Sequence, residues 1–587
     1  MGKPLASPIK VSDYVIQFLK DNGVRDIFTV SGGGCMHLTD SIGRSDIGFV
    51  CTHHEQAASM AAEGYSRISG ISAVVVTTGP GGTNTITGLL GNWLDSIPVI
   101  YISGQVPRSQ LSSGTGCRQI GDQEFDIVSS VKNMTKYSTL VSDKKDIRYH
   151  LEKALTIAKS GRPGPVWVDI PLDIQGDTID VDEMHGYIHN EALPVVPAAC
   201  IKEIKERIQK AKRPLVVVGS GVRRSDAVSE LRDFLELNKI PVATGPHSGI
   251  DVVNDDYEYY AGRFGVLGQV SANNIVQRCD FLLSIGSRLN IKMTGYKYQD
   301  FAPDAYKVMV DIDKHEMNKF NITADKKLVS DAGDFLNILS KERLTEQNKI
   351  SKWLKYVTSK RKEENLVLDK HRNLKEYAST YCFVETLCEK INEDVPIITS
   401  DGTAHVVTLK TAKLKGNQRL FTNVGCASMG YGLPAAIGAS FAIGKKPVVC
   451  IEGDGSIQMN IQELQTVSHH NLPMKIFVIN NDGYLSIRLT QGSFFDKRYV
   501  AIDKDSGVSF PNMEKIADAY GLKYFQIKNN KEIDFTLDQV MGYTRGPVMC
   551  EIFTDPLERH EPKVMAKLKE DGTFEPGNLT DIRAQNE

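Results

Sequence analysis

The sequence predicts an α/β protein that is built from three doubly wound parallel-sheet domains. Short continuous apolar stretches, such as 73–76, 448–451 and 475–479, alternate with amphipathic segments of helical periodicity. Continuous apolar strands between such helices are typical of parallel sheets that are covered on both faces. The alternation restarts near Leu215 and near Pro396, and 587 residues are too many for one hydrophobic core.

The first domain is expected over residues 1–188. Apolar residues from Val11 to Leu19 recur at helical spacing, and Gly23 ends that helix. A strand at 27–30, a glycine loop at 32–34 and a helix from Glu55 follow. Later elements are a strand at 73–77, the loop GPGGTN at 79–84 and a strand at 98–103.

Two further α/β domains, a connector and a tail are expected in the rest of the chain. A Pro- and Ala-rich linker precedes the central domain, which we place at residues 195–340. The charged stretch 341–377 is typical of a solvated helical connector. The third domain occupies 378–556, and a polar tail occupies 557–587.

The composition excludes several classes of function. The formal net charge of −3 gives no electrostatic footprint for nucleic acid, so we expect no nucleic-acid partner. The longest apolar runs are far shorter than the ~20 residues of a membrane span, so we expect no membrane partner. The N-terminal residues contain no apolar signal segment, and the ten cysteines form no CxxC pair. We therefore expect a cytoplasmic protein with reduced thiols.

The most specific pattern lies in the third domain. Gly453, Asp454 and Gly455 follow a buried strand, and one strand–helix–strand crossover later the next strand ends in Asn480 and Asn481. Asp454 and Asn481 should therefore meet at the carboxyl edge of a parallel sheet, where ligands bind. We expect a helix after Gly455, whose N-terminus would favour a phosphate. A carboxylate and an amide oxygen suit Mg²⁺ that also binds phosphate oxygens. The alternative for GDG alone is a simple turn.

The combination of GDG and NN is the thiamine diphosphate motif, and further segments agree with it. The chain resembles the acetohydroxyacid (acetolactate) synthase branch of the thiamine diphosphate enzymes from about Val11 to Pro556. The matching segments are HEQAASMAAEGYSRISG (54–70), TGPGGTN (78–84), SGQVPRS (103–109), SGRPGPVWVDIP (160–171) and GYGLPAAIGA (430–439). The resemblance implies that residues 1–188 are a pyrimidine-binding domain and that residues 378–556 are a diphosphate-binding domain. It also implies a homodimer or homotetramer, in which each cofactor lies between the first domain of one subunit and the third domain of another.

The resemblance also implies which residues carry the chemistry. Glu55 matches the glutamate that hydrogen-bonds the aminopyrimidine ring and lets the cofactor remove its own C2 proton. The cofactor ring then serves as the electron sink when CO₂ leaves a 2-oxo acid. Gly34 and Gln123 match residues that line the reaction pocket. Taken in isolation, a glutamate at a helix N-terminus is often only a favourable partner of the helix dipole.

Other positions match residues that hold the cofactor and its metal ion. Met429 matches the residue under the bend of the cofactor, and the carbonyl of Ala427 should accept from the 4′-amino group. The segment that faces the diphosphate is matched by Thr403, Ala404, His405, Gly453, Gly455, Ser456 and Asn481. Asp454, Asn481 and the carbonyl of Gly483 are the expected Mg²⁺ ligands.

The central domain resembles the flavin-binding version found in acetohydroxyacid synthases. Gly219 and Gly221 would let the backbone approach the FAD diphosphate, and Arg288 would pair with it. Asp311 and Asp331 match positions that contact hydroxyl or adenine groups. The alternative is a central domain that has kept its fold and lost the flavin.

The expected activity is decarboxylation of pyruvate or a related 2-oxo acid, followed by transfer of the acyl unit to an acceptor 2-oxo acid or ketone. A pyruvate oxidase-type oxidoreductase and an inactive scaffold are the alternatives. Two departures concern the acceptor: Lys292 stands where the family has an arginine, and Thr490 stands where it has a tryptophan. Lysine binds a carboxylate less specifically than arginine, so a ketone or keto-sugar acceptor, as in branched-chain deoxysugar synthesis, is a further alternative.

Overall fold

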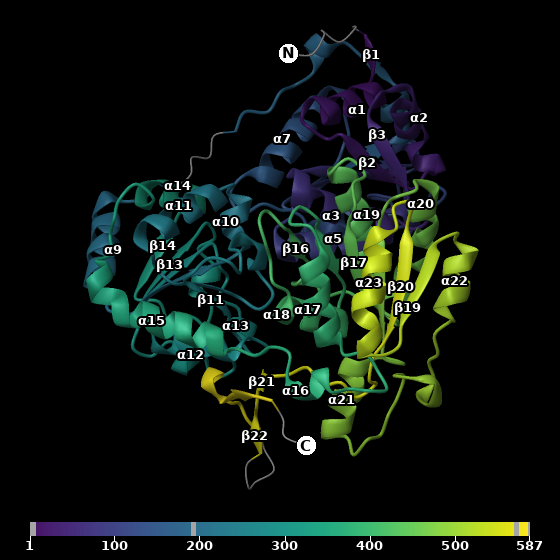
Figure 1. Ribbon diagram of the computed structural model, residues 1–587. Helices are drawn as coiled ribbons and strands as arrows, with labels where there is room; N and C mark the ends of the chain where they lie inside the picture. The colour runs from purple at the N-terminus through teal and green to yellow at the C-terminus, as the bar shows by residue number, and fades with distance from the viewer. Residues whose placement is uncertain (1–7, 190–194, 569–573, 585–587) are drawn as a thin grey trace.

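The computed structural model describes residues 8–189, 195–568 and 574–584. Three six-stranded sheets organise these residues, and each sheet is wholly parallel. In Figure 1 the first domain lies at the upper right, the central domain at the left and the third domain at the lower right. The predicted α/β class with three doubly wound domains is confirmed.

The first sheet has the strand order β3-β2-β4-β5-β7-β6. Its two faces are packed by different side chains, because neighbouring residues of a strand point in opposite directions. In β4, Ala73 and Val75 belong to one hydrophobic cluster, whereas Val74 and Val76 belong to another. The strands are β2 (Asp26–Thr29), β3 (Gly48–Cys51), β4 (Ser72–Val76), β5 (Val99–Gln105), β6 (Tyr137–Leu140) and β7 (Val166–Pro171). The main helices are α1 (Val11–Asp21), α2 (Met36–Arg44), α3 (Glu55–Ser69), α5 (Ile86–Asp95) and α7 (Ile147–Lys159).

The central sheet has the order β11-β10-β9-β12-β13-β14. The chain builds outward from β9 in one direction and then in the other, so the strand order reverses between β9 and β12. The strands are β9 (Pro214–Val218), β10 (Val242–Thr244), β11 (Tyr260–Arg263), β12 (Phe281–Ile285), β13 (Tyr306–Asp311) and β14 (Lys326–Val329). The main helices are α9 (Ala198–Lys210), α10 (Ser220–Arg224), α11 (Val228–Asn238), α12 (Val270–Arg278) and α14 (Ala332–Leu339).

The third sheet has the order β16-β15-β17-β18-β20-β19, with the reversal between β15 and β17. Its strands are β15 (Ile397–Thr399), β16 (Leu420–Phe421), β17 (Val449–Gly453), β18 (Lys475–Asn480), β19 (Lys523–Ile527) and β20 (Val548–Phe553). The main helices are α17 (Thr380–Lys390), α18 (Thr403–Thr411), α19 (Gly432–Ala442), α20 (Leu464–His469), α21 (Leu485–Phe494), α22 (Met513–Ala519) and α23 (Ile533–Gly542).

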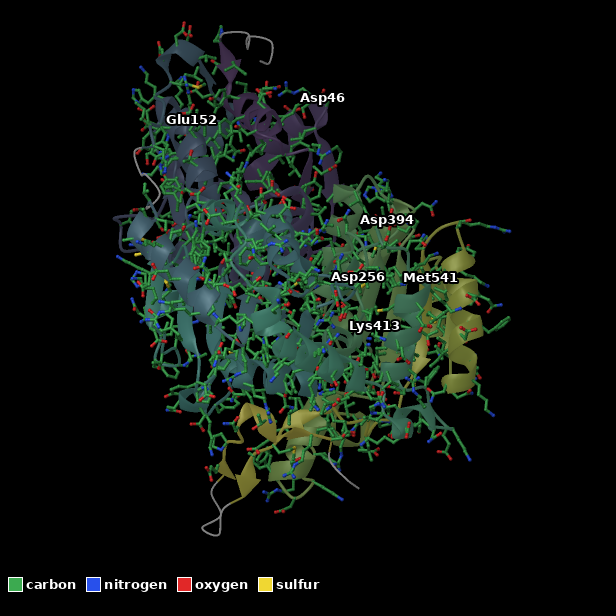
Figure 2. All side chains as sticks on the ribbon, turned by 60° about the vertical axis from the view of Figure 1, so that its left-hand side comes forward. Asp46, Glu152, Asp256, Asp394, Lys413 and Met541 are labelled. Atoms are coloured by element: carbon green, nitrogen blue, oxygen red, sulfur yellow. The ribbon has the colours of Figure 1, made fainter. Side chains whose placement is uncertain are left out.

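The charged connector packs against the central domain through one face of a long helix. Helix α15 (Gln347–Glu363) buries Trp353 and Val357 in a core cluster of that domain. The Trp353 indole N–H also donates to the carbonyl of Pro214 at 2.9 Å. In Figure 2, Asp256 of the central domain and Lys413 of the third domain lie in the same region of the molecule. At this junction Asp255 joins the two domains, since it accepts from Arg263 at 2.8 Å and from the backbone of Leu414 at 2.9 Å.

The tail continues from β20 across the third domain and reaches the central domain. The Val564 N–H donates to the Val266 carbonyl at 2.9 Å, and Asn273 donates to the Leu579 carbonyl at 2.8 Å. Residues 569–573 and 585–587 of the predicted tail lie outside the described part of the chain. Among the described residues, no helix combines the length and apolar character that crossing a membrane requires.

The first and third domains share one hydrophobic cluster, which lies around α3 and α19. Glycines allow these two helices to approach closely. A β-carbon added at Gly64 would lie 2.1 Å from the Ala435 carbonyl oxygen, so neither helix could keep its place if that glycine were changed. The loop before α3 joins the third domain as well, since the His53 N–H donates to Glu463 at 3.0 Å.

Candidate active site

The carboxyl edge of the third sheet brings the predicted metal-binding residues together. Strand β17 ends at Gly453 and the neighbouring β18 ends at Asn480, so Asp454 and Asn481 leave the sheet side by side. The edge also adjoins the point where the strand order reverses. Crevices at such points are the usual ligand sites of open α/β sheets.

The Asp454 carboxylate is held by backbone N–H groups in a buried position. It is 3% exposed and accepts from the Gly455 N–H at 2.8 Å and the Gly483 N–H at 3.1 Å. Burial raises the pKa of Asp454 to about 7, although these N–H groups oppose the shift. A divalent cation at this position would stabilise the ionised carboxylate that burial disfavours.

The side-chain oxygen of Asn481 is available for a cation. Oδ1 is buried and has no hydrogen-bond partner among the described residues, whereas Nδ2 donates to Thr403 Oγ1 at 3.5 Å. Arg488 anchors the backbone of this loop, since it donates to the carbonyls of Asn481 at 3.1 Å and Asp482 at 2.6 Å. An unpaired buried acceptor is costly, and a bound cation would remove that cost.

Gly483 completes the turn of this loop for a steric reason. Its φ is +138°, and an added β-carbon would lie 2.1 Å from the Ile502 carbonyl oxygen. Only glycine fits there, which brings the Gly483 backbone beside Asp454. The described residues contain no cluster of three or more His, Cys, Asp or Glu side chains suited to a metal ion. A site here would therefore combine one carboxylate with amide and carbonyl oxygens and external oxygens.

The α-helix N-terminus at this site belongs to α18, because the helix expected after Gly455 begins with 3-10 turns. Residues Ile457–Glu463 form 3-10 turns with a break at Asn460, and the α-helix begins only at Leu464. Thr403, Ala404 and His405 form the first turn of α18 and are all buried. Their free N–H groups make this end a suitable anion site.

The other predicted cofactor residues lie around the same edge. Ser456 Oγ contacts Ser400 Oγ at 2.7 Å and accepts from the Gly430 N–H at 2.9 Å, which ties down the turn after Met429. Gly455 is required sterically, because an added β-carbon would lie 2.3 Å from the Tyr484 ring. Ala427 has a positive φ of 50° and lies at the rim of the cavity described below.

The three predicted catalytic residues gather at the carboxyl edge of the first sheet. Gly34 follows β2, and its N–H donates to Thr77 Oγ1 at 3.0 Å. The Gln123 carbonyl lies against Thr78, the residue after Thr77, and accepts from its Oγ1 at 3.4 Å. Glu55 begins α3 after β3, and Asn84 Nδ2 donates to its Oε2 at 2.9 Å. Within the described ranges, no hydrogen bond or ion pair joins Glu55 to the Asp454 loop.

A cavity of about 840 Å³ opens at the carboxyl edge of the central sheet, where its strand order reverses. Four residues predicted for the flavin line it: Gly221, Arg288, Asp311 and Asp331. Gly219 lies beneath it, and a β-carbon there would be 2.3 Å from the Gly286 carbonyl oxygen. Asp331 also caps α14, since its side chain accepts from two N–H groups of the first turn.

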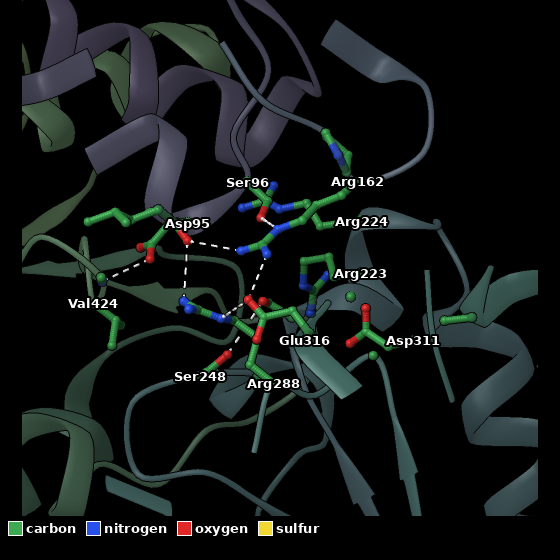
Figure 3. Close-up of a pocket in the computed structure, with 18 of the residues that line it drawn as sticks. Asp95, Ser96, Arg162, Arg223, Arg224, Ser248, Arg288, Asp311, Glu316 and Val424 are labelled. Atoms are coloured by element: carbon green, nitrogen blue, oxygen red, sulfur yellow. Dashed lines mark hydrogen bonds and ion pairs between the residues drawn. The ribbon is translucent and has the colours of Figure 1, made fainter. Parts of the chain in front are cut away.

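Besides the predicted Arg288, the cavity contains charged residues that the sequence interpretation missed. Figure 3 shows Arg162 and Arg288 converging on Glu316, with distances of 2.7 Å and 2.9 Å to its Oε1. Although burial opposes ionisation, the surrounding cations hold the pKa of Glu316 at about 2. Burial, with Arg67 and Arg419 nearby, lowers the pKa of the Arg224 guanidinium to about 9. The arginines of GRPG and GVRR were visible in the sequence, but their convergence was not.

Burial also acts on an acidic group of the cavity. It raises the pKa of Asp311 to about 6, so this carboxyl keeps its proton to a higher pH than an exposed aspartate does. The excess of arginines over carboxylates at this wall suits an anionic ligand such as a diphosphate.

The two residues predicted for the acceptor pocket lie in different places. Lys292 is exposed and lines the cavity of the central domain. Thr490 is exposed on α21, where its hydroxyl donates to the Ser486 carbonyl at 3.0 Å, and it does not line that cavity. Within this one chain the structure does not bring them together.

Comparison with known proteins identifies the class to which this fold and site belong. Three models of the thiamine pyrophosphate enzyme family match: the N-terminal TPP binding domain over residues 9–130, the central domain over 201–339 and the C-terminal TPP binding domain over 401–552. The chain belongs to the thiamine pyrophosphate enzyme family, as its sequence motifs predicted.

Relatives within that family are acetolactate synthases. The acetolactate synthase isozyme 2 large subunit of Escherichia coli (strain K12) is 34% identical over 94% of this chain and 97% of its own length. The acetolactate synthase large subunit of Porphyra purpurea is 32% identical over 92% of this chain and 91% of its own length. Acetolactate synthase 1, chloroplastic, of Nicotiana tabacum is 32% identical over 97% of this chain and 84% of its own length.

Proposed function

We propose that this protein is a thiamine diphosphate-dependent carboligase of the acetolactate synthase type. It decarboxylates pyruvate or a related 2-oxo acid and joins the remaining acyl unit to the carbonyl carbon of an acceptor. The observation that carries this proposal is that buried Asp454 and Asn481 follow neighbouring strands, and that Asn481 Oδ1 has no hydrogen-bond partner among the described residues. The similarity to acetolactate synthases over nearly the whole chain supports the choice of carboligation.

Mg²⁺ would be held by Asp454, Asn481 and the carbonyl of Gly483, with diphosphate oxygens as further ligands. The first turn of α18 and Ser456 would bind the same diphosphate through their N–H and O–H groups. Met429 and the carbonyl of Ala427 would support the thiazolium and aminopyrimidine rings.

When bound, thiamine diphosphate supplies a nucleophilic carbon and an electron sink for decarboxylation. Glu55 would hold a proton against the aminopyrimidine ring, and Asn84 fixes the carboxyl that does so. Gly34 would line the substrate pocket, where an added β-carbon would lie 3.0 Å from both Thr77 Oγ1 and Thr78 Cγ2. Gln123 would contact the reacting groups in the same pocket, where its carbonyl accepts from Thr78 Oγ1 at 3.4 Å.

FAD is the cofactor that best fits the cavity of the central domain. The volume of about 840 Å³ suits a large cofactor, and the glycines at its base allow close approach of a diphosphate. Arg288, Arg223 and Arg224 contribute positive charge to the cavity lining. Asp311 and Asp331 also line the cavity and would bind hydroxyl or adenine groups.

A homodimer or homotetramer would complete the active site. Glu55 and Asp454 come from different domains, and no hydrogen bond or ion pair of the described residues joins them within one chain. The two halves would then meet across a subunit boundary. The ten free cysteines support a reducing compartment such as the cytoplasm.

Two departures from the family pattern concern the acceptor substrate. Lys292, in place of an arginine, offers a single point charge and would bind a carboxylate less strictly. Thr490 offers a small hydroxyl in place of an indole. Both changes favour acceptors beyond 2-oxo acids, including a ketone or a keto-sugar.

The test is incubation of the protein with pyruvate, Mg²⁺, thiamine diphosphate and FAD, followed by identification of the products. Initial rates should be compared for pyruvate alone, 2-oxobutyrate, a simple ketone and a nucleotide-linked keto-sugar. Acceptance of 2-oxo acids alone would contradict the wider acceptor range. Stoichiometric bleaching of the flavin by pyruvate without ligation would favour a pyruvate oxidase-type reaction.

The contribution of Lys292 is tested directly by Lys292→Arg. If lysine causes the wide acceptor range, this variant should shift the ratio of rates toward 2-oxobutyrate and away from a neutral ketone. A matched Lys314→Arg variant, on an exposed lysine that does not line the cavity, should leave the ratio unchanged.

A further inference from the structure

A segment of the chain that follows the third sheet reaches the metal-binding edge. Residues 555–562, which we call the C-terminal strap, are anchored by several side chains of the third domain. Glu558 accepts from Ser379 Oγ at 2.6 Å, and the Tyr381 hydroxyl donates to the Glu561 carbonyl at 2.9 Å. Arg488 donates to the Pro556 carbonyl at 2.9 Å and also to the Asn481 carbonyl. The strap is therefore fixed relative to the Asn481 loop.

The strap places one side chain next to the predicted cofactor segment. His560 Nε2 lies 3.0 Å from Thr403 Oγ1, and Thr403 Oγ1 in turn accepts from Asn481 Nδ2 at 3.5 Å. Asn481 Oδ1 is buried without a hydrogen-bond partner in the described residues. The three side chains form a short chain of hydrogen bonds that ends at an oxygen suited to a cation.

The number of protons available to these three side chains determines how the Asn481 amide is oriented. A threonine hydroxyl has one proton and two acceptor lone pairs, and a neutral imidazole has one acceptor nitrogen. If the Thr403 hydroxyl donates a hydrogen bond to His560, the Thr403 oxygen can only accept from Asn481. The Asn481 amide must then present its NH₂ group to Thr403, because the flipped amide would place its oxygen against the Thr403 oxygen with no proton between them. The amide oxygen is thereby directed away from Thr403.

The charge state of His560 agrees with an acceptor role. Burial lowers the pKa of His560 to about 3, and the positive charge of Lys410 adds to the effect. The ring is therefore neutral at physiological pH and keeps one nitrogen without a proton.

We propose that His560 is a positioning residue of the metal site. It accepts a hydrogen bond from the Thr403 hydroxyl and so fixes the Asn481 amide with Oδ1 toward Mg²⁺. This inference rests on the proposed function, in which Asn481 binds the metal. Partners of this kind, one step removed from the ion, commonly change metal affinity when they are lost.

The test measures Mn²⁺ binding in the presence of thiamine diphosphate, from the loss of the free Mn²⁺ signal in electron paramagnetic resonance. His560→Leu should weaken Mn²⁺ binding by about tenfold or more. Thr403→Val should cause a similar loss, and the double variant should lose little more than either single variant. His560→Gln, whose amide oxygen can accept the same proton, should recover most of the affinity.

A matched control separates this role from simple anchoring of the strap. His371 is also buried and stacks on Tyr381, which holds the strap, but it does not contact Thr403. His371→Leu should therefore leave Mn²⁺ affinity unchanged. An equal loss in His371→Leu and His560→Leu would overturn the proposal, as would normal affinity in folded His560→Leu. If His560→Leu does not fold, normal affinity in Thr403→Val would overturn it equally.

Asp454→Ala distinguishes failure of this inference from failure of the proposed function. If this variant binds Mn²⁺ as tightly as the wild type, the metal site itself is wrong and the role of His560 falls with it. If Asp454→Ala loses the metal while His560→Leu and Thr403→Val keep it, the metal site stands and only the role of His560 is wrong.

Discussion

Gly438 of α19 lies so close to Ala61 of α3 that a β-carbon added at Gly438 would be 1.8 Å from the Ala61 carbonyl oxygen. The backbones of the first and third domains therefore meet almost directly. Helix α3 also begins with Glu55, so this contact fixes the position of the predicted catalytic glutamate relative to the third domain of the same chain.

Gly438→Ala should destabilise the protein, because the added methyl group forces two backbones apart within a shared core. Overpacking of this kind costs about 1–3 kcal/mol, and the melting temperature should fall. Gly43→Ala is the matched control, since Gly43 also lies in a helix but an added β-carbon meets nothing within 4 Å. A melting temperature that is equal in both variants would show that the contact between α3 and α19 tolerates the extra group.

Glu55→Gln should keep the fold and the affinity for thiamine diphosphate but lose turnover by about 100-fold or more, because an amide cannot exchange the proton. Asn84→Ala should cause a smaller loss, since it frees the carboxyl and leaves its chemistry intact. The measurements are pyruvate consumption and calorimetric binding of the cofactor. Pyruvate consumption at the wild-type rate by Glu55→Gln would remove this residue from the mechanism.

Asp454→Ala should abolish the Mg²⁺ dependence of thiamine diphosphate binding, because the diphosphate would reach the protein largely through the ion. Calorimetric titration of the cofactor, with Mg²⁺ and with a chelator, measures this dependence. Asp482→Ala is the neighbouring control, because Asp482 is exposed and no hydrogen bond to its carboxylate is seen in the described residues. Unchanged cofactor affinity in Asp454→Ala with Mg²⁺ would refute the metal assignment.

A buried carboxyl in the first domain predicts a pH dependence of stability. Burial raises the pKa of Asp169 to about 7, although Ser103 and Gln105 hydrogen-bond it. Unfolding lets this group release its proton at lower pH, so its contribution favours the folded state less as pH rises from about 4 to 7. As pH rises over this interval, the melting temperature of the wild type should therefore fall relative to that of Asp169→Asn.

The control for this prediction is Asp394→Asn, which changes an exposed carboxyl that is visible in Figure 2. Its difference in melting temperature from the wild type should stay nearly constant over the same interval. A constant difference for Asp169→Asn as well would show that the Asp169 carboxyl does not titrate between folded and unfolded states.

Sequence reasoning succeeded where chemistry and local topology coincide. Asp454 and Asn481 follow consecutive parallel strands, and such strands must end at the same edge of their sheet. The same reasoning was only partly right after Gly455, because the residues between Ile457 and Glu463 form 3-10 turns that are interrupted at Asn460, and the α-helix follows them. There the Asn460 side chain bonds the Gly430 carbonyl at 2.8 Å, a contact far away in the sequence.

The sequence by itself determined the three α/β domains, the family and the residues expected to hold the cofactor, because strand periodicity and short motifs are local. Only the tertiary structure decided that Arg162, Arg288 and Glu316 meet in one cavity and that His560 lies against Thr403. More than a hundred residues of sequence separate Arg162 from Glu316, and also Thr403 from His560. Their contacts depend on how whole domains and the C-terminal strap pack, which no local pattern encodes.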